Sequence, residues 1–148
     1  MVSIETLRSF HYFAGVGNEC LHAVAGIAEE RHFKQGAILF KESDPSRGLY
    51  IVRQGQVDIV YRLRGGEGRV VDTVGGGDLI GWSSLVDPFR STATAVARDA
   101  GSAVWIEATG IRTLCERDPT LGYHLLKALT EVLSRRLQGA LVQLAAGS

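Results

Sequence analysis

Short runs of β-forming residues, separated by turn-forming glycines, occupy the middle of the chain and limit its fold most strongly. Their lengths and spacing are typical of a small barrel or jelly roll. The expected strands cover residues 31–33, 37–40, 49–52, 57–63, 69–74, 92–97 and 102–106. The sequence therefore predicts a mainly β fold of this type.

Three turns divide these strands. Residues 42–48 (Glu-Ser-Asp-Pro-Ser-Arg-Gly) are dense in turn formers. The pair Gly55-Gln56 is so short that the strands on either side of it are expected to be antiparallel neighbours. Residues 65–68 (Gly-Gly-Glu-Gly) predict a further hairpin between the next two strands.

Helical spacing of apolar residues flanks the β region on both sides. Residues 4–13 and 19–28 predict two helices before it. Residues 109–117 predict a short helix after it, and Asp118-Pro119 separates this from a long helix over residues 120–144. The predicted fold is therefore a β-barrel with flanking helices and a long C-terminal helix.

The length of 148 residues allows one domain with a real core, since such a domain buries roughly 68–70% of its unfolded surface. We expect a single domain over residues 1–148. Its parts are N-terminal helices in 1–30, a barrel in 31–107 and C-terminal helices in 108–148.

The long C-terminal helix is amphipathic over several turns. Its apolar stripe comprises Leu126, Leu129, Leu133, Leu137, Ala140 and Leu144. Steps of three and four residues suit both packing on the barrel and a coiled-coil seam. We favour core packing for the half nearer the barrel. For the distal half, a seam with a second copy or a partner protein is an equal alternative.

Charge and hydropathy exclude several classes of protein. The 16 basic and 16 acidic residues cancel, and a protein that held DNA alone would usually show a basic face. No helix-turn-helix segment follows the long helix, so we expect no nucleic-acid binding by this chain. The sequence carries no membrane-spanning run and no signal-peptide pattern. We therefore expect a cytoplasmic location and no membrane partner.

Residues 75–85 combine glycines and hydroxyl side chains in a way that suits an anion. They predict one short helical turn, whose backbone N–H groups favour negative charge. Arg90 begins the next strand, and a guanidinium can hold a phosphate through two parallel N–H donors. If the loop brings Arg90 to face Ser83 and Ser84, the segment forms a phosphate pocket.

These segments resemble the cyclic-nucleotide-binding domain family, which includes Crp/Fnr-type regulators, protein kinase A regulatory subunits and cyclic-nucleotide-gated channels. Residues 33–40 resemble its F-x-x-G-x-x-L-F entry, and residues 42–45 its E-G-D-P turn. Residues 48–57 resemble its x-L-Y-x-V-x-x-G-x-V hairpin. Residues 77–81 and 90–94 resemble the two halves of its phosphate-binding cassette. The shared order and spacing identify the chain as a member without the DNA-binding helix-turn-helix.

The resemblance implies a ligand site in residues 77–94. The backbone around Ser83 and Ser84 would hold a cyclic phosphate, with Arg90 as its counter-charge. The implied ligand-binding positions are Gly81, Trp82, Ser83, Ser84, Arg90, Ser91 and Thr92.

Trp82 departs from the family pattern, because it stands where the family carries an acidic residue that accepts a bond from the ribose 2′-hydroxyl. An indole donates one N–H and accepts nothing. Losing such a partner typically costs about 1–3 kcal/mol, which is roughly tenfold to a hundredfold in affinity. Trp82 either fills the ribose-base cavity, which we favour, or stacks on the ligand. A weaker alternative register gives the acidic role to Asp78.

Two further departures bear on the ligand. Residues 135–138 resemble the R-R-L-Q of the bacterial regulators. In the cyclic-AMP receptors of the family, small hydroxyl residues then meet the adenine. Here Gly139, Ala140 and Leu141 follow, so that route to base recognition is missing. The cassette is also about one residue shorter than usual between its glycine and its arginine.

Catalysis and metal binding are not expected. The sequence shows no nucleophile–base set, paired carboxylates or Walker step. The four histidines have no partner at metal-like spacing, and two cysteines cannot hold a four-cysteine iron–sulfur cluster. Cys20 and Cys115 are expected to be free and buried. No catalytic residue, metal or cofactor is predicted beyond cyclic AMP or cyclic GMP as a ligand.

The sequence thus predicts a ligand-sensing regulatory module. It would bind a cyclic nucleotide or a related small phosphorylated anion and relay the change through its C-terminal helix to a second copy or another protein. The alternative is a scaffold or interaction module that kept the fold and lost the ligand.

Overall fold

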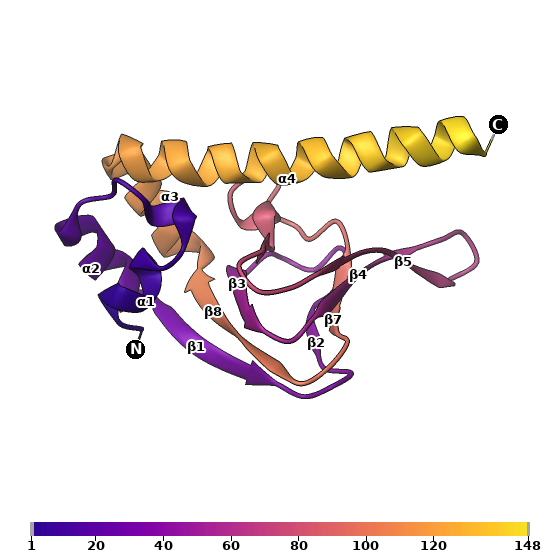
Figure 1. Cartoon of the computed structure of the whole chain (residues 1–148), viewed down its shortest axis with the longest axis horizontal. Coiled ribbons are helices and arrows are strands. Elements are labelled where there is room, and N and C mark those ends of the chain that lie inside the picture. The colour runs from indigo at the N-terminus through magenta and orange to yellow at the C-terminus, as the bar shows by residue number, and fades with distance from the viewer. Residues whose placement is uncertain (1, 148) are drawn as a thin grey trace.

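The computed structural model describes residues 2–147, which form two four-stranded antiparallel sheets with helices around them (Figure 1). The strand orders are β1-β8-β3-β6 and β2-β7-β4-β5. The strands are β1 (Ala28–Phe33), β2 (Ile38–Phe40), β3 (Gly48–Gln54), β4 (Val57–Arg62), β5 (Gly68–Val74), β6 (Leu79–Ile80), β7 (Thr94–Ala97) and β8 (Gly101–Glu107). This is a jelly roll, which confirms the predicted fold class.

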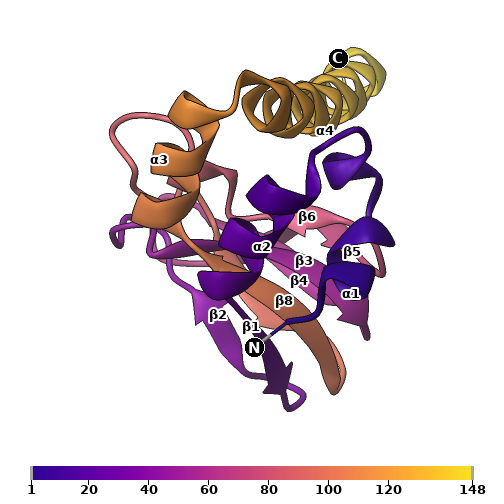
Figure 2. The ribbon, with the colours of Figure 1, turned by 90° about the vertical axis from the view of Figure 1, so that its left-hand side faces the viewer.

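The helices lie at the two ends of the chain, apart from one turn between β6 and β7. They are α1 (Ile4–Arg8), the 3-10 helix η1 (His11–Phe13), α2 (Asn18–Gly26), the 3-10 helix η2 (Trp82–Ser84), α3 (Ala108–Arg117) and α4 (Pro119–Ala146). Figure 2 shows α1, α2 and α3 in front of the strands, with α4 seen nearly end-on above them.

One predicted strand pairing is wrong. The hairpin β4–β5 forms as expected, with Val57 opposite Val74, but β3 and β4 belong to different sheets. The link between them carries the chain from one sheet to the other. Gly55 has a φ of 83°, and Gln56 N donates to Asp99 Oδ1 at 2.6 Å. These features hold residues 55–56 against the β7–β8 loop, so β4 does not fold back onto β3.

The two N-terminal helices are shorter than predicted. The first α-helix ends at Arg8, where Ser9 Oγ donates to Thr6 O at 2.5 Å, and only the short η1 follows. Helix α2 ends at Gly26, and Ala28 begins β1 opposite Ile106. Tertiary pairing with β8 therefore overrides the helical spacing at Ala28.

The sheet β1-β8-β3-β6 has apolar residues on both faces, because successive side chains of a strand point to opposite sides. Leu49 and Ile51 of β3 belong to a core shared with the helices. Tyr50 and Val52, which alternate with them, belong to a second core between the two sheets. This sheet is therefore the middle layer of the molecule.

Helix α4 begins with a clear capping arrangement and then leaves the core. Asp118 Oδ1 accepts from the N–H groups of Thr120 and Leu121, and Pro119 occupies the first helical turn. The buried residues of the helix are Leu121, Gly122, Leu125, Ala128, Leu129 and Val132. Beyond them the helix runs above the β4–β5 hairpin, with most of its residues exposed (Figure 1). The predicted core packing of the near half is confirmed, and the distal seam stays a prediction.

Two glycine-to-alanine changes should separate a tight backbone contact from an open one. A Cβ on Gly101 would overlap the carbonyl oxygen of Gln54, whereas a Cβ on Gly139 of α4 meets nothing within 4 Å. We expect Gly101→Ala to lower the unfolding free energy by about 2 kcal/mol or more, since overpacking forces the backbone to shift. Gly139→Ala should raise it by roughly 1 kcal/mol through helix propensity. Urea denaturation measures both, and equal effects would contradict the β3–β8 packing.

Candidate functional site

The turn from β6 into η2 is built on a glycine that no other residue replaces easily. Gly81 has a φ of 79°, and a Cβ there would lie 2.9 Å from Gly48 O of β3. Glycine therefore lets the chain turn while touching the neighbouring strand. Ser84 N donates to Gly81 O at 3.0 Å and Leu85 N to Trp82 O at 2.9 Å, which closes the predicted helical turn.

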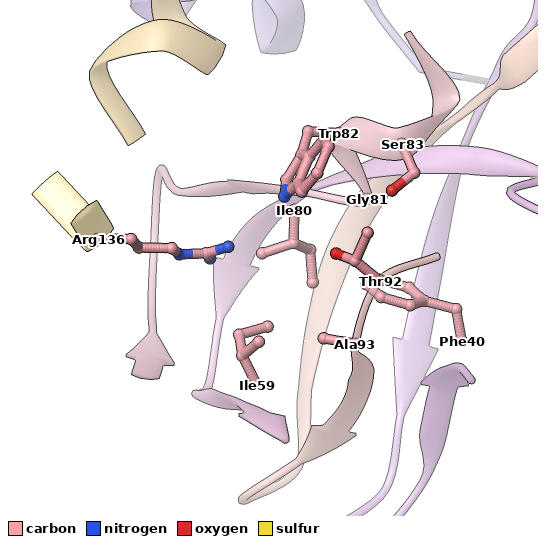
Figure 3. A pocket seen from close by; sticks show the side chains of 9 residues that line it. All are labelled: Phe40, Ile59, Ile80, Gly81, Trp82, Ser83, Thr92, Ala93 and Arg136. Atoms are coloured by element: carbon pink, nitrogen blue, oxygen red, sulfur yellow. The ribbon is translucent and has the colours of Figure 1, made fainter. Parts of the chain in front are cut away.

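A small hollow lies between this turn, the two sheets and α4 (Figure 3). It is lined by Phe40, Ile59, Ile80, Gly81, Trp82, Ser83, Thr92, Ala93 and Arg136. The space left for the centre of a water molecule is about 10 Å³, which is room for roughly one water. In this arrangement the hollow is too small for a nucleotide.

Four of the seven predicted ligand-binding positions line this hollow, namely Gly81, Trp82, Ser83 and Thr92. The other three lie outside its wall. Ser84 and Ser91 are buried, and the Ser84 hydroxyl lies 2.7 Å from that of Ser46.

Arg90 is exposed and directs its guanidinium elsewhere. Its Nη1 donates to Ser43 O at 2.9 Å. Its backbone forms an isolated bridge with Pro45, and β7 begins only at Thr94. Arg90 therefore stands in the chain between η2 and β7, with its charge bound to the turn at residues 42–48.

That turn is attached to the cassette by backbone hydrogen bonds. Ser43 N donates to Ser91 O at 2.7 Å, and Ser91 N donates to Asp44 O at 2.9 Å. Ser46 N donates to Phe89 O at 2.7 Å. The two segments, far apart in the sequence, therefore form one continuous structure beside the hollow.

Two arginines from the C-terminal helices, neither of them a predicted site residue, reach the cassette. Arg112 of α3 donates to Ser84 O at 2.8 Å and stacks over Phe89 with 4.1 Å to the ring centroid. Arg136 of α4 lines the hollow and pairs through Nε with Asp72 Oδ2 of β5 at 3.1 Å. The only sequence signal was the family-like R-R-L-Q segment, which contains Arg136.

The polar groups around the hollow are mainly donors. Arg136 brings a positive charge, the indole of Trp82 brings an N–H, and Ser83 and Thr92 bring hydroxyls. No carboxylate is among the described lining residues, and Asp72 is paired with Arg136. The hollow can therefore attract an anion but offers no charged acceptor to a sugar hydroxyl.

Asp78 lies away from this hollow. Its Oδ2 accepts from Gly75 N at 2.9 Å, which closes the turn before β6. It lines a different depression with Tyr12 and Arg135. The Tyr12 hydroxyl donates to Gly77 O at 2.5 Å, and burial, reinforced by the Asp78 charge, raises its pKa to about 12. Asp78 thus has a structural role, which disfavours the alternative register.

The cysteines are free, as expected, but half-buried rather than fully buried. Burial, reinforced at both by Asp118, raises the pKa of each thiol to about 11. Residues 2–147 contain no cluster of three or more His, Cys, Asp or Glu side chains suited to a metal. Within the same residues, none of the helices has the length and apolar character to cross a membrane.

Comparison with known proteins adds to this geometry. The model of the cyclic nucleotide-binding domain family matches residues 30–118. The chain is 28% identical over 132 residues to a cyclic AMP receptor protein of Thermus thermophilus, covering 89% of this chain and 59% of that protein. It is 30% identical over 129 residues to an uncharacterized NTE family protein of Mycobacterium tuberculosis, covering 86% of this chain and 21% of that protein. The chain thus spans only part of the length of these relatives.

A solved structure extends the match over almost the whole chain. A candidate cyclic nucleotide-binding protein from Geobacter metallireducens superposes with a TM-score of 0.81 at 31% identity. The superposition covers 93% of this chain and 99% of that chain. The agreement therefore includes the flanking helices as well as the sheets.

Proposed function

The chain belongs to the cyclic nucleotide-binding domain family, and we propose that it binds a cyclic nucleotide or a related small phosphorylated anion in the hollow beside η2. The observation that carries this proposal is the meeting of remote segments around one hollow. Gly81 to Ser83, Thr92 and Arg136 come from three parts of the chain and supply a donor-rich wall. Donors and a guanidinium are the groups that hold phosphate oxygens.

Arg90 would supply the second positive charge. Its guanidinium is exposed, and among residues 2–147 it binds only a neutral carbonyl, Ser43 O. A phosphate is a stronger partner because the bond is then charge-assisted. Rotation of this side chain toward Ser83 would complete the site. Ser91, Ser84 and Thr92 lie in the segments that such a ligand would contact.

A ligand would act on α4 through Arg136. This side chain lines the hollow and ties α4 to β5 through Asp72, so an anion would compete with Asp72 for it. A ligand shifts an equilibrium only by binding one arrangement better than another, and a hollow of about 10 Å³ requires such a change. The exposed apolar residues of distal α4, Leu137 and Leu141, would pass it to a second copy or to another protein.

Thermal unfolding with cyclic AMP, cyclic GMP or inorganic phosphate tests this function. A ligand at about 100 times its dissociation constant adds roughly 2.7 kcal/mol, which is several degrees in a domain of this size. Arg90→Ala should abolish most of the shift. Arg64→Ala, which removes the same charge from an exposed position in the β4–β5 loop, should leave it unchanged. Equal losses in both variants would mean only a general charge effect.

A second candidate function is a scaffold that has lost its ligand. The observation in its favour is that Trp82 packs against the helical core and helps to close the hollow to about 10 Å³. Absence of any thermal shift with all three compounds would favour this role, in which α4 serves a protein partner.

A further inference from the structure

A second and much larger hollow opens between the two sheets, beside the turn at residues 42–48. Its volume is about 800 Å³, within the range of roughly 300–1,000 Å³ common for small-molecule sites. The lining residues that matter here are Arg31, Phe40, Lys41, Arg47, Tyr50 and Trp105. Among the described residues, only Phe40 lines both this hollow and the smaller one beside η2.

Aromatic rings form the inner wall of this second hollow. Trp105 of β8 and Tyr50 of β3 face each other across the ladder, and the rings of Phe40 and Tyr50 lie 6.1 Å apart. A Cβ on Gly48 would overlap the Trp105 indole, so the glycine lets the indole lie close over β3. The indole N–H of Trp105 has no hydrogen-bond acceptor among residues 2–147.

Positive side chains surround this wall. The Arg31 guanidinium lies 3.8 Å from the centroid of the Trp105 ring and pairs with Glu29 at 2.6 Å. Lys41 and Arg47 are exposed at the rim, and neither side chain has an ion pair within the described chain.

Two carboxylates, those of Asp44 and Glu107, also line the hollow. Their negative charges must be counted together with the positive ones. Glu107 caps α3 by accepting from Gly110 N, and it keeps its negative charge. Asp44 has no ion pair among the described residues. The side chains that line the hollow therefore carry three positive charges, from Arg31, Lys41 and Arg47, against two negative charges.

We propose that this second hollow binds a small organic anion that carries a flat ring. The ring would lie against Phe40 and Tyr50, since Arg31 covers the face of Trp105 and aromatic pairs add to the free energy of apolar burial. The charged group, a carboxylate or a phosphate, would lie between Lys41 and Arg47 and accept from the indole N–H. This site is distinct from the one proposed beside η2.

The two tryptophans allow a test that reports on each hollow separately. The chain contains two, Trp82 in the first hollow and Trp105 in the second. Fluorine NMR of protein labelled with fluorotryptophan gives one resonance for each, assigned with Trp82→Phe and Trp105→Phe. The probes are naphthoate and naphthyl phosphate, which differ in the anionic group, naphthylmethanol, which lacks the charge, and acetate, which lacks the ring.

We expect naphthoate, naphthyl phosphate or both to shift the Trp105 resonance with saturation, and the stronger of the two identifies the preferred anionic group. The double variant Lys41→Gln/Arg47→Gln should weaken this binding at least about tenfold, as loss of two charge-assisted bonds implies. The matched double variant Arg62→Gln/Arg64→Gln removes two exposed charges elsewhere and should bind as the parent does. All the altered side chains are exposed, so both variants should fold.

Three results would overturn the proposal. The first is a Trp105 resonance that does not move with any probe at millimolar concentration. The second is an equal shift with naphthylmethanol, which would mean an apolar crevice without anion recognition. The third is a shift confined to Trp82, which would locate the anion in the first hollow.

Discussion

Leu125→Ala is expected to lower the unfolding free energy by about 2–5 kcal/mol, the range for a fully buried leucine. Leu125 has no exposed surface and belongs to the core formed by the helices and β3. It lies in the part of α4 that holds this helix on the molecule. Losing the Leu125 side chain would weaken the packing that holds α4 against the rest of the molecule.

The matched control is Leu141→Ala in the same helix. Leu141 is 55% exposed, so its loss should change the unfolding free energy of a monomer by no more than about 0.5 kcal/mol. Urea denaturation at low protein concentration measures both variants. If the two effects were equal, the division of α4 into a packed half and an exposed half would be wrong.

The same control tests the proposed seam. If distal α4 pairs with a second copy, Leu141→Ala should weaken self-association while leaving the monomer stable. Analytical ultracentrifugation over a range of concentrations measures this. A parent protein that remains monomeric throughout would direct the search to another partner.

Trp82→Glu is expected to raise the affinity for cyclic AMP by roughly tenfold to a hundredfold, because it supplies the missing acceptor for the ribose 2′-hydroxyl. Glutamate is also smaller than tryptophan and would enlarge a hollow that now holds about 10 Å³. Titration calorimetry with the parent and the variant measures the change. Some stability will be lost, since Trp82 packs against the helical core.

Two controls separate the acceptor from the added space. Trp82→Leu enlarges the hollow without an acceptor and should give the smaller gain. The deoxy analogue of cyclic AMP, which lacks the 2′-hydroxyl, should gain no more from glutamate than from leucine. If the deoxy analogue gained as much as cyclic AMP, the acidic position would not lie at Trp82.

Local patterns predict the fold well where neighbouring strands pair. The glycines at 65–68 predict the β4–β5 hairpin because its partners are adjacent in sequence. The short link at Gly55-Gln56 wrongly predicts that β3 and β4 pair, because the sheet to which each strand belongs depends on distant strands. β3 pairs with β8, placing Ile51 opposite Val104, and no feature of the link itself encodes that pairing.

The candidate site, like the fold, is predictable where it depends on local sequence and not where it depends on distant contacts. Gly81 and Ser83 lie at the hollow because one short turn positions them, and such a turn is readable from glycine and hydroxyl spacing. Arg112 and Arg136 reach the cassette only through the packing of α3 and α4, which the sequence does not display. The direction of the Arg90 side chain likewise depends on the carbonyl of Ser43, which lies 47 residues earlier in the chain.

The measurement that tests the central claim most directly is the fluorescence of Trp82 during titration with cyclic AMP. The Trp105→Phe variant makes Trp82 the sole tryptophan of the chain. Ligand entry into the hollow must move or cover this indole, so we expect a saturable change in emission that Arg90→Ala weakens at least about tenfold. Emission that stays constant through millimolar cyclic AMP, cyclic GMP and phosphate, in a protein that remains folded, would contradict ligand binding at this site.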